Sequence, residues 1–295
     1  MATTIEMPGA VELIPATRQA LWGWPAVANF ALGGLGAGLY VKAVVAGAFG
    51  PSPAVTIAAW LGPALVLAGF LAIATESGRP LRGPRVLTRV RTSWMSRELW
   101  LGAIFVALAG ADLAVPLPSG RRYAGALAAI GFVVAQGFIL REARAVVAWS
   151  LPAMPLLFLV SAAISGDGLF LGLEAATGRA PRTIALAGTA ALLLAGGAAW
   201  RALVSGAGDE AIARSLAPLT EGRAGALVFG GAYVAPFLLV ALASLLPPAG
   251  TAAAAGLAGF LMVAGQVHAK ARLILRAGRL RPITLAAPRL HRRTS

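Results

Sequence analysis

The longest stretch of this sequence without a charged side chain runs from residue 224 to residue 269. A membrane-spanning helix needs only ~20 mostly apolar residues, so this stretch is roughly twice the length of one crossing. Pro247-Pro248-Ala249-Gly250 interrupts it near the middle, and such a sequence ends one helix before another begins. Two membrane crossings are therefore expected from this segment alone.

Similar apolar runs elsewhere in the chain predict further crossings. In total we expect eight transmembrane helices, near residues 25–49, 53–75, 98–117, 123–141, 149–173, 183–205, 224–246 and 251–274. The polar stretches between them are too short to form a hydrophobic core of their own. The expected fold class is therefore all-α, a polytopic membrane helix bundle. Residues 1–295 would form a single eight-helix integral membrane domain with a short basic cytoplasmic C-terminal tail.

The overall composition excludes several classes of protein. Only 12% of the residues are charged and 58% are hydrophobic, whereas a soluble domain carries about 25% charged residues. An ordinary soluble enzyme, a disordered tail and a nucleic-acid binder are therefore excluded. The chain has no cysteine, so it cannot form disulfides or ligate an iron–sulfur cluster through thiolates. Chemistry on a soluble substrate must then belong to another subunit or take place within the membrane.

The basic residues are distributed unevenly between the two membrane faces. Eight crossings put both termini on one face, and 20 of the 25 Lys and Arg residues fall on that face, with four on the other. By the positive-inside rule, both termini are expected in the cytoplasm, in an inner (cytoplasmic) membrane. Six of these arginines lie in the short loop 76–97. They also suit a docking surface for an acidic partner subunit, and both interpretations stay open.

Two aspartates fall inside predicted spans. Asp112 lies well within the third span and Asp167 late in the fifth. Ionisable groups at membrane depth are costly and mark functional sites by default, so both residues are candidates for a proton pathway. Alternatively, Asp112 can pair with Arg121 or Arg122, and Asp167 can lie near the membrane surface.

Other polar residues in the spans have simpler interpretations. Lys42 and Lys270 can extend their ammonium groups to the membrane surface. The only histidines are His268 and His291, and His291 falls in the polar tail, too far along the chain to reach a bundle core. A haem ligated by two histidines is therefore not expected. Without cysteine or clustered carboxylates, a bound metal is not expected either.

The first span opens with paired tryptophans and continues into a glycine-rich run. Trp22-Gly23-Trp24-Pro25 suits an interfacial aromatic belt, and Gly33-Gly34-Leu35-Gly36-Ala37-Gly38 allows a neighbouring helix to approach closely. Packing and anchoring explain these residues but not Asn29, whose buried amide needs a hydrogen-bond partner. That partner is either a neighbouring helix or a ligand carbonyl.

Several of these motifs resemble the polysulfide reductase/nitrite reductase membrane-anchor family (NrfD/PsrC-like). Trp22-Gly-Trp-Pro, Asn29 and the glycine run through Tyr40 are similar to its first helix. The loop motif Glu76-Ser-Gly-Arg-Pro-Leu-Arg82 resembles its acid-x-Gly-Arg-Pro signature. The strings Arg91-Thr-Ser-Trp-Met-Ser-Arg-Glu98 and Gln266 to Gly278 look closest to anchors of dimethyl-sulfoxide-reductase-type enzymes. Trp149, Pro152, Pro155 and Phe158 also fit the family's fifth span.

The resemblance implies a membrane anchor subunit that binds quinone or quinol. Such anchors exchange electrons between the quinone and a four-cluster ferredoxin-like iron–sulfur subunit. That subunit serves a catalytic molybdopterin or multihaem subunit, so the chain would not act on the soluble substrate itself. The anchor carries no redox centre of its own, in agreement with the missing cysteines and haem ligands.

Site residues follow from the same resemblance. Asn29 falls where relatives place a polar quinone ligand and Glu76 where they keep an acid, and Trp22 is expected to bind the quinone with them. Many relatives have Tyr-Thr-Gly in the fourth span, whereas this chain has Ala135-Gln136-Gly137, so Gln136 would replace the phenol. The expected partner-docking residues are arginines of the loop before the third span: Arg79, Arg82, Arg91 and Arg97.

Two other functions compete with the anchor. A proton- or solute-translocating protein would use Asp112, Asp167, Lys42 and Gln136 to line a path, but the inverted repeats and paired broken helices of many transporters are missing. A scaffolding membrane protein without a ligand would only pack Asn29 and Gln136.

Overall fold

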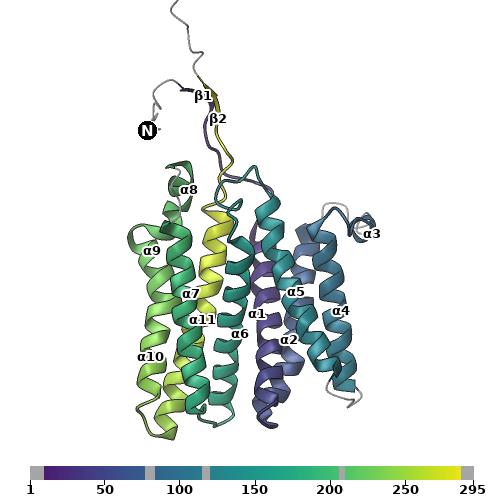
Figure 1. Cartoon of the computed structure of the whole chain (residues 1–295), viewed down its shortest axis with the longest axis vertical. Helices are drawn as coiled ribbons and strands as arrows, with labels where there is room; N and C mark the ends of the chain where they lie inside the picture. The colour runs from purple at the N-terminus through teal and green to yellow at the C-terminus, as the bar shows by residue number, and fades with distance from the viewer. Residues whose placement is uncertain (1–9, 77–83, 115–119, 206–209, 287–295) are drawn as a thin grey trace, which may run out of the picture.

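The computed structural model describes residues 10–76, 84–114, 120–205 and 210–286. Long helices run side by side in a bundle, and a short two-stranded ribbon projects from one end (Figure 1). We call the end that carries the ribbon the strand end and the opposite end the far end. Both terminal segments of the described chain lie at the strand end (Figure 1).

The elements follow one another along the chain as an alternation of long helices and short connections. They are β1 (Ala10–Ile14), α1 (Trp24–Gly47), α2 (Pro53–Glu76), α3 (Pro84–Leu87), α4 (Trp94–Ala114), α5 (Gly120–Glu142), α6 (Met154–Ala176), α7 (Thr183–Ser205), α8 (Glu210–Thr220), α9 (Gly222–Phe229), the π-helix η2 (Gly230–Val234), α10 (Ala235–Ala243), α11 (Pro248–Leu275) and β2 (Ile283–Ala286).

The helical architecture agrees with the class expected from the sequence, since nearly all of the secondary structure in the described residues is helical. Among the described residues, seven helical stretches are long and apolar enough to cross a membrane: α1, α2, α5, α6, most of α7, the continuous stretch from α9 to α10, and α11. The charge-free segment from 224 to 269 gives two of them, as predicted.

The expected count of eight crossings is not confirmed, because α4 is not among these seven stretches. Arg97, Glu98 and Asp112 lower its hydropathy. Nevertheless α4 packs along α5 and α2 within the bundle (Figure 1). The eighth crossing therefore stays a prediction, and α4 is its candidate.

Proline and glycine set the breaks between these helices. Between α1 and α2 the chain turns at Gly50, whose φ of 125° is accessible mainly to glycine. The Ser52 hydroxyl then accepts a hydrogen bond from the Val55 amide at 3.2 Å and caps the start of α2. In the last third of the chain, the π-helix η2 precedes Pro236, which cannot donate a backbone hydrogen bond.

The first helix, α1, is the central element of the bundle and contacts α2, α5, α6 and α11. Its glycines allow backbones to meet directly. A Cβ added at Gly38 would overlap the Ala162 carbonyl of α6, and one added at Gly36 would overlap the Gly62 carbonyl of α2. Helices in lipid associate largely through such close packing of small residues. The glycine run therefore positions α1 against two neighbours at once.

A feature absent from the sequence prediction is the antiparallel pairing of β1 with β2, which joins the two ends of the described chain. Where the ribbon meets the helices, the backbone amide of Gln19 donates to the Gly278 carbonyl at 2.9 Å. An isolated bridge between Val146 and Leu280 adds the α5–α6 connection to this assembly. The strand end is thus fixed by contacts between segments that are distant in sequence.

Candidate functional site

A buried polar cluster lies between α1, α4 and α5, toward the strand end of the bundle. Asn29 Nδ2 donates to Glu98 Oε1 at 3.1 Å, and Gln136 Nε2 donates to the same oxygen at 3.0 Å. Gln136 Nε2 also lies 3.5 Å from the Asn29 carbonyl oxygen. The three residues are 3%, 6% and 0% exposed, respectively. We call them the Asn29–Glu98–Gln136 cluster.

Two oxygen atoms of this cluster have no hydrogen-bond partner among the described residues. They are Asn29 Oδ1 and Gln136 Oε1, and both are buried. A buried polar atom without a partner costs about 1–3 kcal/mol, so such atoms are rare without a reason. The cluster therefore retains capacity to bind another polar group, as expected of a ligand site.

Glycine makes room for the cluster on α1. A Cβ added at Gly33 would lie 2.7 Å from Gln136 Nε2 and 3.0 Å from the ring of Phe132. One residue later, a Cβ added at Gly34 would lie 2.7 Å from the Lys270 ammonium nitrogen on α11. Two polar side chains from different helices thus approach α1 at consecutive glycines.

Glu98 is the residue of the cluster that sequence reasoning missed. It closes the string Arg91-Thr-Ser-Trp-Met-Ser-Arg-Glu98, and the third predicted span begins at this residue. The structure instead places it one turn inside α4, where it is buried. The signal available in the sequence was a carboxylate directly before an apolar run. A buried acid needs hydrogen-bond donors, and the amides of Asn29 and Gln136 could supply them.

The two other expected quinone-site residues lie nearer the strand end. Glu76 Oε1 accepts a hydrogen bond from the Gly23 amide at 2.7 Å, while its second carboxylate oxygen is buried and has no partner among the described residues. Trp22 stacks on Trp149 with ring centroids 5.0 Å apart. Asn29 lies seven residues beyond Trp22, so the cluster is about 10 Å deeper in the bundle. The structure therefore joins Asn29 to Gln136 directly, but gives Glu76 and Trp22 other partners.

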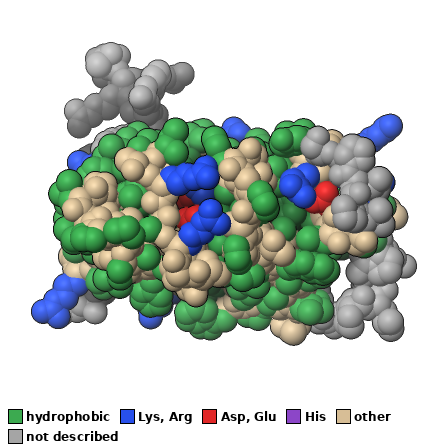
Figure 2. Space-filling view, turned by 90° about the horizontal axis from the view of Figure 1, so that it is seen from below, with side chains coloured by type: hydrophobic (Ala, Val, Ile, Leu, Met, Phe, Trp, Pro, Cys, Tyr) green, Lys and Arg blue, Asp and Glu red, His purple; other side chains and the backbone are tan. Residues whose placement is uncertain are grey.

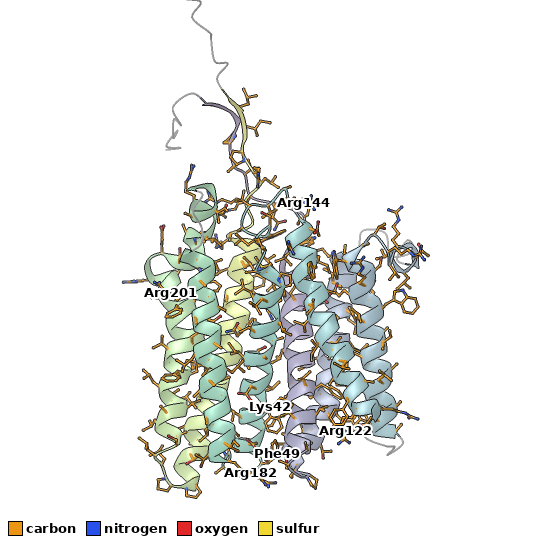
Figure 3. All side chains as sticks on the ribbon, in the orientation of Figure 1. Lys42, Phe49, Arg122, Arg144, Arg182 and Arg201 are labelled. Carbon is orange, nitrogen blue, oxygen red and sulfur yellow. The ribbon has the colours of Figure 1, made fainter. Side chains whose placement is uncertain are left out.

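The two candidate proton-pathway acids lie elsewhere. Asp112 Oδ2 pairs with Arg122 Nε at 3.0 Å, which is one of the pairings anticipated from sequence. Asp167 forms an ion pair with Lys42 and accepts a hydrogen bond from the Thr189 hydroxyl at 2.6 Å. Lys42 and Arg122 both lie toward the far end (Figure 3). Neither acid contacts the Asn29–Glu98–Gln136 cluster.

The expectation that Lys270 extends its ammonium group to the membrane surface is wrong, because this residue is only 5% exposed. Its ammonium nitrogen lies 5.7 Å from the centre of the Phe158 ring, and no described carboxylate lies within ion-pair distance. It lines a cavity of about 40 Å³ with Ser161, Tyr233 and Gln266. Gly34 removes the side chain that would otherwise occupy the position of this ammonium group.

Two of the four predicted docking arginines fall in the described residues: Arg91 just before α4, and Arg97 in the first turn of α4. Arg79 and Arg82 lie outside the described residues. Arg91 is exposed, whereas Arg97 donates to the backbone carbonyls of Val90 and Arg91 at 2.9 and 2.8 Å. The Arg97 guanidinium also stacks on Trp94, 4.1 Å from the ring centre. Arg97 therefore orders the segment that leads into α4.

The fold and the site together define a polytopic helical membrane protein with a buried polar cluster near one end. Residues 24–117 match the model of one family, described as "DMSO reductase anchor subunit (DmsC)". This segment runs from α1 to just beyond α4 and contains Asn29, Glu76 and Glu98. No curated protein matches the chain. The match supports the expected resemblance to anchors of DMSO-reductase-type enzymes, while the narrower NrfD/PsrC-like assignment stays a prediction.

Proposed function

We propose that this chain is the membrane anchor subunit of a DMSO-reductase-type oxidoreductase, of the NrfD/PsrC-like kind, that binds quinone or quinol. The observation that carries the proposal is the Asn29–Glu98–Gln136 cluster, with its two unpartnered amide oxygens. The family match over residues 24–117 supports the anchor role independently of that geometry.

The chemistry of the cluster fits a quinone headgroup. A quinol hydroxyl needs an acceptor, and a quinone carbonyl needs a donor. An amide side chain offers both, since its oxygen accepts and its nitrogen donates. Asn29 Oδ1 and Gln136 Oε1 are free to accept from a quinol hydroxyl, and rotation of either amide would present a donor to a carbonyl. The same cluster therefore suits both redox forms.

When bound, quinone supplies the two-electron chemistry, and its interconversion with quinol moves two protons. Glu98 Oε1, held by Asn29 and Gln136, is the atom of the cluster that can take up or release a proton. Glu76 and Trp22 lie closer to the strand end and would line the approach to the cluster. The Gly23 amide, which donates to Glu76 Oε1, fixes that carboxylate at the start of α1.

The partner subunits are proposed to dock at the strand end. Asn29 and Glu98 lie within two turns of the start of their helices, and Gln136 lies within two turns of the end of α5. All three are thus about 10 Å from that end. A four-cluster ferredoxin-like iron–sulfur subunit bound there, over Arg79, Arg82, Arg91 and Arg97, would exchange electrons with the quinone over a short distance. A molybdopterin or multihaem subunit would complete the complex.

The termini are proposed to be cytoplasmic, in an inner membrane, because eight crossings would put 20 of the 25 Lys and Arg residues on the same face as the termini. The far end would then face the opposite side of the membrane. Asp112 and Asp167 lie toward that side, each held by a basic partner. We include both in the proposal as residues of a proton pathway between the far end and the cluster.

One observation favours a second candidate function, a proton- or solute-translocating protein. The half-buried Lys42 and the buried Asp167 and Thr189 form a chain of charged and polar contacts in the membrane-spanning region. Intramembrane ion pairs of this kind occur along ion pathways. Transport by the chain without partner subunits would distinguish this candidate from the anchor.

The experiment that tests the quinone site is Gln136→Leu in the intact complex, with Gln266→Leu as the matched control. Gln266 is also a buried glutamine of a spanning helix, but it lines the small cavity beside Lys270 and is not part of the cluster. We expect Gln136→Leu to lower quinone-linked turnover about tenfold, as loss of a buried hydrogen bond to the ligand would. Turnover with a soluble artificial electron carrier should not change. Equal quinone-linked turnover in both variants would contradict the proposed site.

A further inference from the structure

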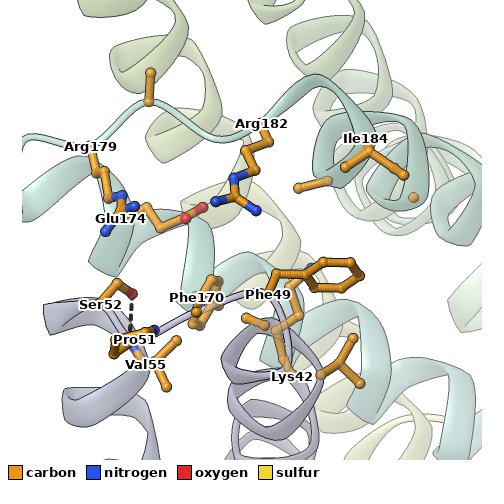
Figure 4. Close-up of a pocket in the computed structure, with 16 residues that line it drawn as sticks. Lys42, Phe49, Pro51, Ser52, Val55, Phe170, Glu174, Arg179, Arg182 and Ile184 are labelled. Atoms are coloured by element: carbon orange, nitrogen blue, oxygen red, sulfur yellow. Dashed lines mark hydrogen bonds between the residues drawn. The ribbon is translucent and has the colours of Figure 1, made fainter.

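A groove at the far end of the bundle separates α1 from α7. Two cavities of about 290 and 280 Å³ lie next to each other there, and both are lined by Lys42, Val45 and Gly188. The first opens at the far end, beside the α1–α2 and α6–α7 connections (Figure 4). The second continues between α1, α5, α6 and α7. The groove exists because α7 packs mainly on α6 and α10 rather than on α1.

The walls of this groove are largely hydrocarbon. Val45, Phe49 and Ile184 are 53%, 64% and 72% exposed, which is unusual for large apolar side chains in water but normal for those that face lipid. The deeper cavity is lined almost entirely by small and aliphatic residues of the four helices. An apolar chain is therefore the occupant that such walls favour.

The mouth of the groove is basic. Arg179 and Arg182 lie on either side of the Glu174 carboxylate (Figure 4), yet neither guanidinium is within ion-pair distance of a described carboxylate. Deeper in, Lys42 is neutralised by Asp167. The described lining thus holds three basic and two acidic residues, an excess of one positive charge. From the far end, basic side chains appear in a few places on a mainly hydrophobic surface (Figure 2).

We propose that this groove binds an anionic phospholipid. The headgroup phosphate would lie on Arg179 and Arg182, because guanidinium groups bind phosphate oxygens through paired N–H donors. One acyl chain would pass Phe49 and Val45 into the deeper cavity. A phosphodiester without a cationic headgroup carries one negative charge and matches the single excess positive charge of the lining. The lipid would fill the space that α7 leaves beside α1.

Glu174 determines how selective this site is. Its carboxylate lies between the two arginines (Figure 4) and repels a phosphate that approaches them. Removing that negative charge should therefore strengthen lipid binding, whereas removing the arginines should weaken it. The two substitutions change the charge of one cavity in opposite directions, which separates a specific site from a general loss of structure.

The test uses the full chain in its complex, in nanodiscs that contain equal amounts of phosphatidylglycerol and phosphatidylcholine. Native mass spectrometry then counts the lipids retained after detergent release. We expect phosphatidylglycerol to be retained over phosphatidylcholine by about fivefold for each arginine. Arg179→Gln with Arg182→Gln should remove the preference, and Glu174→Gln should increase it. The matched control is Arg121→Gln, because Arg121 is exposed at the same end but lines neither cavity.

Several results would overturn the proposal. Equal retention of the two lipids by the unmodified chain would show that the groove does not select charge. A preference that survives the double arginine substitution, or falls equally in Arg121→Gln, would place the lipid elsewhere. Retention of a neutral quinone in place of phospholipid would assign the groove a different occupant. If the double variant does not fold, two results still test the proposal. Glu174→Gln should increase the preference for phosphatidylglycerol, and high salt should weaken that preference in the unmodified chain.

Discussion

Gln136 approaches α1 at Gly33 so closely that a Cβ at residue 33 would lie 2.7 Å from the Gln136 amide nitrogen. The same nitrogen donates to Glu98 Oε1 at 3.0 Å. The position of the Gln136 amide therefore depends on the missing side chain of a residue on another helix. This contact connects the glycine-rich sequence of α1 to the geometry of the proposed quinone site.

The first prediction concerns this contact. Gly33→Ala should displace the Gln136 amide and break its hydrogen bond to Glu98, lowering quinone-linked turnover of the complex about tenfold. The control is Gly110→Ala on α4, where an added Cβ meets nothing within 4 Å. That substitution should leave turnover unchanged. If Gly33→Ala has normal turnover, the Gln136 amide is not held as the structure shows.

The second prediction concerns Glu98. Glu98→Gln keeps an oxygen that can accept from Asn29 and Gln136, but it cannot exchange a proton. We expect the variant to assemble normally and to lose about 100-fold in quinone-linked turnover, a typical loss for a missing acid–base group. Glu98→Leu should in addition lower the thermal stability of the complex, because two buried amides lose their acceptor. Unchanged turnover in Glu98→Gln would show that this carboxylate only packs the helices.

The third prediction separates two roles for the Lys42–Asp167 pair. Removing one partner of a buried ion pair costs about 3 kcal/mol, while replacing both restores most of the stability. Lys42→Met and Asp167→Asn should therefore each lower the unfolding temperature, and the double variant should recover it. If Asp167 belongs to a proton pathway, quinone-linked turnover stays low in the double variant. Recovery of both stability and turnover would make the pair purely structural.

The fourth prediction concerns partner docking. Arg91→Glu reverses an exposed charge at the strand end and should weaken binding of the iron–sulfur subunit about fivefold, with a strong dependence on ionic strength. Arg91 is preferable to Arg97 for this test, since Arg97 also holds its own segment through backbone carbonyls. Arg121→Glu, at the far end, is the matched control. Equal subunit retention in the two variants would locate docking elsewhere.

The sequence predicts the membrane helices well because apolar length alone defines them. It does not settle α4, whose three ionisable residues lower its hydropathy although it packs within the bundle. The β1–β2 ribbon is also missed, because its strands are short and pair across almost the whole chain. Local patterns carry no information about such distant pairing.

The candidate site is predicted in part for similar reasons. Asn29 is recognisable because a lone amide in an apolar span needs a partner, and the structure supplies Glu98. Glu98 is missed because a charge at the start of an apolar run resembles a helix boundary. Lys270 is misjudged because the space for its ammonium group depends on Gly34 of another helix. In each case the missing information is the packing of helices against one another.

The most direct test of the anchor function is affinity purification of this chain from its native membrane, followed by mass spectrometry of co-purifying proteins and of extracted quinone. An anchor subunit should co-purify with a cysteine-rich ferredoxin-like subunit, a large molybdopterin or multihaem subunit, and quinone. A stable, monodisperse chain that purifies alone and without quinone would contradict the anchor function and favour the translocating protein.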